Sequence, residues 1–221
     1  MPGKVFVSIG MSLDGFSAPE SMEGLLATPE QREQDPRLDH WMAQWMELQG
    51  WLFAQRFFQE RLHLGEGGEE GSDNDIVRET FERTGANIMG KRMFDLGEHA
   101  WPEEAPFHVP VYVLTHERRS PWERPGGTTF YFVNDGIHHA LDQAREAAGE
   151  RDIRISGGSE TVLAYLNAGL VDELSISVAP VLFGAGTRLF EGVDASRIAL
   201  KPLHSKSSAR VTHLTYTVHP R

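Results

Sequence analysis

The chain has 221 residues, no cysteine and a formal net charge of −11 at pH 7. The missing cysteines exclude disulfides and thiolate metal sites, and the negative charge argues against nucleic acid or an anionic membrane as a partner. The sequence shows neither a signal peptide pattern nor an apolar run near the roughly 20 residues of a membrane-spanning helix. We therefore expect a cytoplasmic protein folded as one domain over residues 1–221.

An apolar run over residues 5–11 predicts a buried first strand, which residues 12–15 end. Asp14 and Gly15 form a turn pair, because both residue types tolerate positive φ. A second interpretation gives Asp14 a role at the carboxyl end of a central strand, where α/β folds gather ligands. The sequence alone favours the turn.

Residues 20–75 form an insertion rich in aromatic side chains. Asp35 and Pro36 predict a helix start, and Gly50 is expected to break the helical pattern that follows. The large side chains of this pattern at helical spacing are Leu38, Trp41, Met42, Trp45, Met46 and Leu52. They predict core or a subunit interface, with a lid over a flat substrate ring as the alternative. Residues 65–72 mix glycine with Glu66, Glu69 and Glu70, which predicts a mobile loop that repels phosphate.

Asp75 is expected to cap a short helix that ends before Gly85, and residues 86–89 predict a strand. Gly90 then opens a helix whose first turn carries Lys91 and Arg92. Cations at a helix N-terminus oppose the helix dipole, and a bound anion would reverse that cost. The pair therefore indicates an anion site, or alternatively an ordinary solvated face.

Residues 110–115 form an apolar run, typical of a strand covered on both faces. Thr115, His116, Arg118 and Arg119 follow at its end and offer a hydroxyl group and two cations. Another strand is predicted over residues 130–133, and an alanine-rich helix over residues 136–148, stopped by Gly149.

The central unit is predicted over residues 152–190, as strand, glycine turn, helix and strand. Gly157 and Gly158 break the strand directly before the helix, so bare backbone and a helix N-terminus face whatever lies beyond the strand. The alternative is a tight turn without a ligand. A nucleophile elbow at Ser159 is excluded, because Thr161 stands where that motif needs glycine.

Residues 180–190 predict a flexible glycine loop, and residues 198–203 and 211–218 an antiparallel strand pair. None of the ten histidines shows a metal-ligand spacing, so we expect no metal site.

The order of these motifs resembles the dihydrofolate-reductase-like superfamily, specifically the reductase domain of the riboflavin-biosynthesis deaminase-reductase and its stand-alone relatives. The matching segments are residues 12–15, 89–94, 113–115, 157–158, 169–174, 180–186 and 189–190. The resemblance covers nearly the whole chain outside residues 20–75. It implies an α/β fold with a mostly parallel central sheet flanked by helices, an antiparallel C-terminal strand, and a homodimer.

The resemblance also implies an NADPH site. Its cofactor-binding positions fall on Gly90, Lys91, Arg92, Thr115, His116, Gly157, Gly158, Ser159, Glu160 and Thr161. Lys91 or Arg92 lies near the 2′-phosphate in this comparison, and the turn at Gly158 lies under the pyrophosphate. Asp14 falls on the loop beside the nicotinamide, where it is a candidate catalytic residue.

We therefore expect an NADPH-dependent reductase that delivers hydride to a C=O or C=N group of a small heterocycle, pteridine-like or pyrimidine-like. We expect no deaminase half, since the chain has no cysteine to hold its zinc. None of Asp39, Glu47 and Glu60 can be assigned as the helix carboxylate that orients a pteridine in dihydrofolate reductase. Folate reduction is therefore disfavoured. The alternatives are a non-catalytic dinucleotide-binding or phospholigand-binding protein that keeps the fold, and a structural dimer without a ligand.

Overall fold

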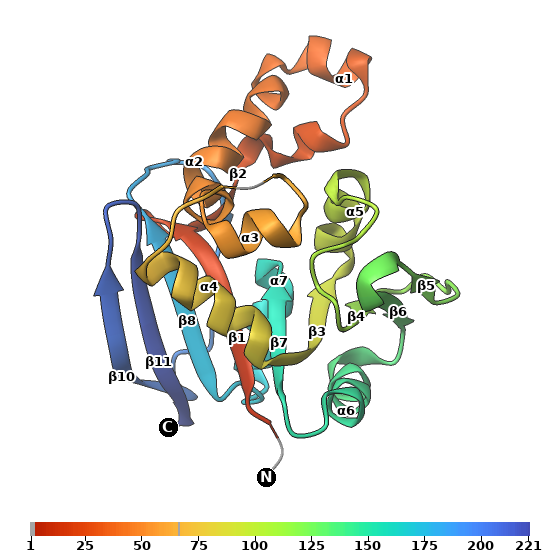
Figure 1. Cartoon of the computed structure of the whole chain (residues 1–221), viewed down its shortest axis with the longest axis vertical. Helices are drawn as coiled ribbons and strands as arrows, with labels where there is room; N and C mark the ends of the chain where they lie inside the picture. The colour runs from red at the N-terminus through yellow and green to blue at the C-terminus, as the bar shows by residue number, and fades with distance from the viewer. Residues whose placement is uncertain (1–2, 66) are drawn as a thin grey trace.

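The computed structural model describes residues 3–65 and 67–221, so Glu66 of the predicted acidic loop lies outside the described residues (Figure 1). Its centre is a nine-stranded sheet in which the neighbours from β8 through β6 are all parallel. The strands in spatial order are β10 (Ile198–Ser207), β11 (Thr212–Pro220), β8 (Glu173–Ala179), β1 (Val5–Ser12), β7 (Asp152–Gly157), β3 (Thr84–Gly90), β4 (Pro110–Leu114), β6 (Thr129–Val133) and β5 (Trp122–Glu123). The mostly parallel sheet and the antiparallel pair β10–β11 confirm the predicted α/β architecture.

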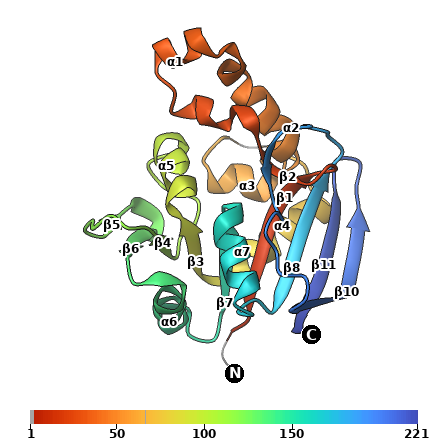
Figure 2. The same cartoon turned by 180° about the vertical axis from the view of Figure 1, so that it is seen from behind.

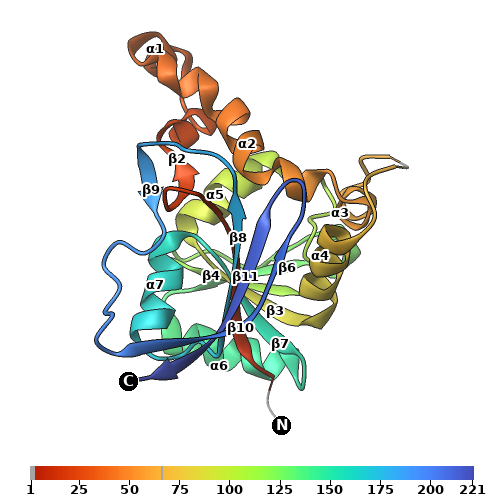
Figure 3. The same cartoon turned by 90° about the vertical axis from the view of Figure 1, so that its left-hand side faces the viewer.

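Helices cover both faces of this sheet (Figures 2 and 3). One face carries α2 (Trp41–Phe53), α3 (Arg56–Arg61) and α4 (Ser72–Arg83), and the other carries α6 (Gly136–Ala148) and α7 (Ser159–Asn167). The helix α5 (Lys91–Ala100) follows β3 and packs Phe94 against the side of β3 and β4 that carries Met89 and Val111. Among residues 3–65 and 67–221, no helix combines the length and apolar character needed to cross a bilayer.

The two faces of the central strands differ in polarity. Alternate residues of β1 and β7 are apolar, and Val5, Val7, Ile153 and Ile155 are buried in the core under α6 and α7. Because side chains alternate across a strand, the residues between them point to the α4 side. That side is buried as well, since α2, α3 and α4 cover it.

Small elements surround the carboxyl end of the sheet. They are β2 (Phe16–Pro19), paired with β9 (Gly186–Arg188), and the helices η1 (Glu20–Leu25), α1 (Pro29–Gln34) and η2 (Pro36–His40). The short helix η3 (Pro125–Gly127) lies at the opposite end of the sheet, before the start of β6. The strand β9 lies within the segment predicted as a flexible loop, so that prediction is wrong in part. Pairing with β2 fixes this part of the loop.

Two predicted helix boundaries are wrong. The helix α2 continues through Gly50 to Phe53, since one glycine costs a helix only about 1 kcal/mol. Asp75 lies inside α4, whose N-cap is Gly71, and the helix ends at Arg83. The predicted start at Asp35 is confirmed, because its carboxylate accepts the amide of Arg37. The aromatic helix is only partly covered, with Met42 51% and Met46 40% exposed.

Candidate functional site

Three turns, at Gly90, Thr115 and Gly158, come together at the carboxyl edge of the sheet. Strands β7, β3 and β4 are neighbours, with Met89 opposite Gly157 and Gly90 opposite Leu114. The turns that follow these strands therefore lie side by side. They bring Gly158, Gly90 and Thr115 to one edge, as ligand-binding α/β sheets do.

Two helix N-termini meet at this edge without side-chain caps. Gly90 is the N-cap of α5 and Gly158 the N-cap of α7, and no side chain accepts an amide of either first turn. The first amides of a helix have no acceptor within the helix and carry a partial positive charge. Both first turns can therefore donate hydrogen bonds to an anion such as a diphosphate.

The two N-cap glycines differ in the space around them. A Cβ atom on Gly90 would stand 2.5 Å from Oγ1 of Thr161, so Gly90 is required for the contact between the two turns. A Cβ atom on Gly158 would meet no atom within 4 Å. The backbone of Gly158 has φ −71°, so its side-chain position is open rather than strained. The peptide bond between Gly157 and Gly158 is cis.

Two of the three side chains in the first turn of α7 are buried and contact other parts of the protein. Ser159 and Thr161 are buried, and the Ser159 hydroxyl hydrogen-bonds to that of Ser17 on β2 at 2.5 Å. Glu160 is exposed. Of the predicted residues in this turn, Ser159 and Thr161 can thus offer a ligand their main-chain amides, while their side chains fix the turn to β2 and β3.

Lys91 and Arg92 both lie in the first turn of α5, as predicted, and both are paired with carboxylates. Nζ of Lys91 lies 2.5 Å from Asp95 and 3.3 Å from Glu117. The hydrogen bond to Asp95 is the main cause of the raised pKa of Lys91. Arg92 forms an ion pair with Glu23 of η1. A phosphate at this position would have to replace these carboxylates.

Thr115 and His116 follow β4, next to the start of α5. The hydroxyl of Thr115 accepts the amide of Glu117 at 3.0 Å, and its carbonyl accepts Asn134 at 3.1 Å. His116 is exposed. Arg119 is paired with Glu98 at 2.6 Å and lies against aromatic rings, so it is held away from the ligand edge.

Asp14 lies beyond β1 and binds main-chain amides. Its carboxylate accepts the Ser12 hydroxyl at 2.6 Å and the amides of Phe183 and Gly184 at 3.1 Å and 2.7 Å. The hydrogen bond from the Ser12 hydroxyl and those from the two backbone amides lower the pKa of Asp14 to about 2. The group is thus ionised near neutral pH, which suits an acceptor and disfavours a proton donor. Gly15, with φ 93°, completes the predicted turn.

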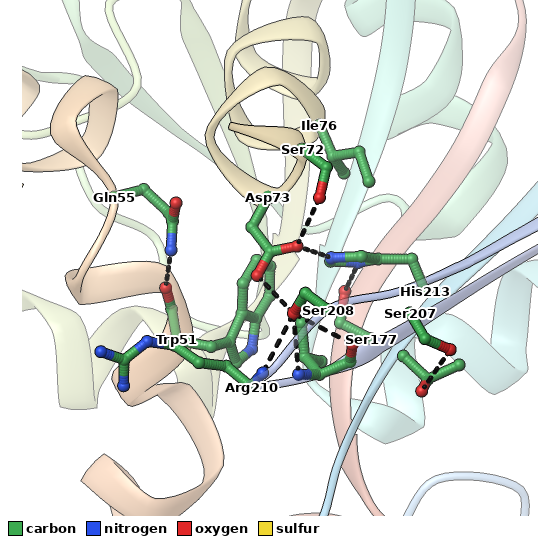
Figure 4. A network of polar contacts seen from close by, with 12 residues as sticks. Trp51, Gln55, Ser72, Asp73, Ile76, Ser177, Ser207, Ser208, Arg210 and His213 are labelled. Carbon is green, nitrogen blue, oxygen red and sulfur yellow. Dashed lines mark hydrogen bonds and ion pairs between the residues drawn. The ribbon is translucent and has the colours of Figure 1, made fainter. Parts of the chain in front are cut away.

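A buried polar network lies on the α4 side of the sheet (Figure 4). Nδ1 of His213 on β11 lies 2.9 Å from the Ser177 hydroxyl on β8, and Nε2 lies 3.3 Å from Asp73 in the first turn of α4. Ser208 donates to the other oxygen of Asp73 at 2.7 Å, and the Trp51 ring packs edge-on against His213. Burial lowers the pKa of His213, although Asp73 opposes the shift. The network joins α2, α4, β8 and β11.

None of the residues of this network was predicted from the sequence. Ser177 and His213 occupy alternate positions of their strands, which the pattern alone cannot distinguish from solvent-facing positions. Asp73 faces the sheet because α4 begins at Ser72, before the predicted cap at Asp75. No cluster of three or more His, Cys, Asp or Glu side chains suited to a metal occurs in residues 3–65 and 67–221.

The chain matches known proteins over most of its length. Residues 3–214 match the family model described as RibD C-terminal domain. The uncharacterized protein YyaP of Bacillus subtilis (strain 168) is 29% identical over 136 residues, which cover 58% of this chain and 71% of YyaP.

Solved structures share the fold at low sequence identity. A Shewanella sp. PV-4 protein whose name refers to riboflavin biosynthesis has a TM-score of 0.61 at 20% identity and covers 98% of this chain and 99% of its own. Enterococcus faecalis dihydrofolate reductase, complexed with NADP(H) and RAB-propyl, has a TM-score of 0.51 at 14% identity over 100% of this chain and 98% of its own. The Thermotoga maritima diaminohydroxyphosphoribosylaminopyrimidine deaminase/5-amino-6-(5-phosphoribosylamino)uracil reductase has a TM-score of 0.55 at 14% identity, over 98% of this chain but 56% of its own.

Proposed function

This chain belongs to the RibD C-terminal domain family, and from that premise we propose that it is an NADPH-dependent reductase of a small heterocyclic substrate. The reducible group is a C=O or C=N bond of a pteridine-like or pyrimidine-like ring. The complex of the dihydrofolate reductase neighbour with NADP(H) supports the choice of cofactor.

The observation that carries the proposal is the pair of uncapped helix N-termini at Gly90 and Gly158. Two sets of uncapped amides and one open glycine position offer a site for a dinucleotide diphosphate, and two cations lie nearby. The residues therefore fit the phosphate part of NADPH. A single helix N-terminus would be common in proteins of this class, whereas two that meet across adjacent strands are more specific.

NADPH, when bound, supplies the hydride, and the chain supplies binding and orientation. The amides of the first turns of α5 and α7 hold the diphosphate. Gly158 lets the phosphates approach the main chain closely because it has no side chain. Asp14 holds the Phe183–Gly184 segment beside the end of β1. Because Asp14 is ionised, we propose that water provides the proton that accompanies the hydride.

Lys91 and Arg92 are proposed to recognise the 2′-phosphate that distinguishes NADPH from NADH. Their present partners, Asp95, Glu117 and Glu23, hold the two side chains at the start of α5. Binding then exchanges the carboxylate partners of these side chains for a phosphate, so the net gain in binding free energy is smaller than it would be for unpaired cations.

The test compares the two cofactors by calorimetric titration. Wild-type protein is expected to bind NADPH more tightly than NADH, and Arg92→Ala and Lys91→Ala should each narrow this preference by about tenfold, the value of one charge-assisted contact. Arg37→Ala is the control, since Arg37 is another exposed arginine paired with a carboxylate, Asp35. Equal affinity of the wild-type protein for both cofactors would contradict the proposed role of Lys91 and Arg92.

A second possibility keeps the binding site and omits the chemistry, as a protein that senses a dinucleotide. NADPH oxidation with a panel of carbonyl and pteridine compounds separates the two possibilities, because only a reductase turns over.

The homodimer expected from the resemblance is also part of the proposal, and analytical ultracentrifugation measures the oligomeric state directly.

A further inference from the structure

Arg154 lies in the middle of β7, on the side of the sheet that α4 covers. Its neighbours across the sheet are Phe6 on β1 and Asn87 on β3, which are both buried. The guanidinium lies 5.3 Å from the ring centre of Phe81 on α4. A cation thus stands among aromatic and polar side chains under a helix.

The guanidinium has few partners in this position. Within the described residues, its only hydrogen bond runs from one terminal nitrogen to the carbonyl of Ser8, at 3.1 Å. Its Nε is sealed from solvent and has no partner. A guanidinium has five N–H donors, and a buried cation is costly unless it is paired. Burial lowers the pKa of Arg154 to about 10, so the group remains a cation at neutral pH.

Arg83 provides the contrast on the same side of the sheet. It lies at the end of α4 over the ring of Phe6, and donates to Asp152 and Glu173, each at 2.7 Å. The fold therefore pairs one half-buried arginine twice and leaves the other without a carboxylate. Arg83 thus has two carboxylate partners, whereas Nε of Arg154 is sealed from solvent and has no partner.

The surroundings of Arg154 point toward the ligand edge. Its side chain reaches Ser8, which lies further along β1 toward the carboxyl end than Phe6. Ser156 follows on the same side of β7 and donates to Asn87 at 2.7 Å, and Gly157 comes next. Arg154 as a whole residue is half-buried, and Nε is the nitrogen of its side chain that is both sealed and unpartnered.

We infer that Arg154 receives an anionic oxygen of the substrate, of the carboxylate class, and so sets the charge of the molecules that the site accepts. Arginine binds such groups with two parallel hydrogen bonds, which fixes the orientation of a planar ligand. The assignment of this ligand as the reducible substrate rests on the proposed function. That Arg154 binds a carboxylate does not depend on the proposed function.

The first test measures stability without any cofactor. A buried unpaired charge can often be replaced by an apolar side chain at no loss of stability. We therefore expect Arg154→Met to leave the Tm unchanged or to raise it, by about 2–4 °C for a chain of this size. Arg83→Met should lower the Tm, because it removes the arginine that binds both Asp152 and Glu173. A fall for Arg154→Met as large as that for Arg83→Met would assign Arg154 a structural role and overturn the inference.

The second test uses formate, the smallest carboxylate, as the probe. Formate should raise the Tm of the wild-type protein above its value in chloride of equal ionic strength, and this rise should vanish in Arg154→Met. Gly158→Asp should keep the rise, which separates this site from the phosphate-binding turn. The same response in the wild-type protein and Arg154→Met, including no response in either, overturns the inference. No NADPH is present, so a failure of the proposed cofactor would not affect this result.

Discussion

Asp14 shows how one side chain can organise the rim of the site. Its carboxylate accepts a hydroxyl and two amides, and so links the turn after β1 to residues 183–184 on a distant segment. The turn that the sequence favours is correct. The amides that Asp14 binds could not be predicted, because they lie about 170 residues away in the chain.

Asp14→Asn should loosen that segment near neutral pH. The pKa of Asp14 is depressed to about 2, so the contribution of its ionised form to stability is fully present above about pH 4 and is lost as the pH falls through about 2. We expect faster hydrogen exchange of the Phe183 and Gly184 amides at pH 7, and a stability difference from wild type that shrinks toward pH 2.

The matched control is Asp194→Asn, which removes another half-buried carboxylate that accepts a local amide and hydroxyl, both from Ser196. It should leave the Phe183 and Gly184 amides unchanged. Unaltered exchange of those two amides in Asp14→Asn would show that the carboxylate does not hold the segment.

The surroundings of Arg154 and His213 could not be predicted from the sequence. Both occupy polar positions of alternating strands, a pattern that predicts the strand but not what covers it. Only the placement of helices over that side of the sheet buries His213 and half-buries Arg154. The glycines of the site were predictable, since a strand followed by glycine and a helix is a local signal.

At the scale of elements, the site depends on the close contact between the starts of α5 and α7. Gly90→Ala would place a methyl group 2.5 Å from Oγ1 of Thr161, which is buried. We expect a loss of about 1–3 kcal/mol in the free energy of unfolding, the usual cost of overpacking. Urea denaturation measures it.

The second substitution Thr161→Ala removes the clashing oxygen, so the double variant should regain much of that loss. Gly158→Ala is the control, because a methyl group there meets no atom within 4 Å. Additive losses in the double variant would contradict the contact between the two turns.

Helix starts were predictable where a glycine or an Asp-Pro pair marks them, as for α5, α7 and η2. The start of α4 was not, since Gly71 gives a weaker signal than the nearby Asp75. That shift decides which carboxylate faces the sheet, and it explains why Asp73 was missed.

At the scale of the whole molecule, the strand order assembles the site. Strands β1, β7, β3 and β4 are neighbours although they lie far apart in the sequence, and their carboxyl ends share one edge. The resemblance to a known family predicted a mostly parallel sheet but not the order of its strands, and periodicity alone predicts the strands and not their neighbours. The protein carries a net charge of −11, so the proposed anion binding would rely on local amides and a few cations rather than on the overall charge.

The most direct measurement is a calorimetric titration of NADPH into the wild-type protein and Gly158→Asp. The substitution has room in the ligand-free fold, so its thermal unfolding should match that of wild type, while its carboxylate would stand where the proposed diphosphate lies. We predict micromolar binding to the wild-type protein and no detectable binding to the variant. Equal binding to both, or no binding to the wild-type protein, would contradict a dinucleotide site at these two helix N-termini.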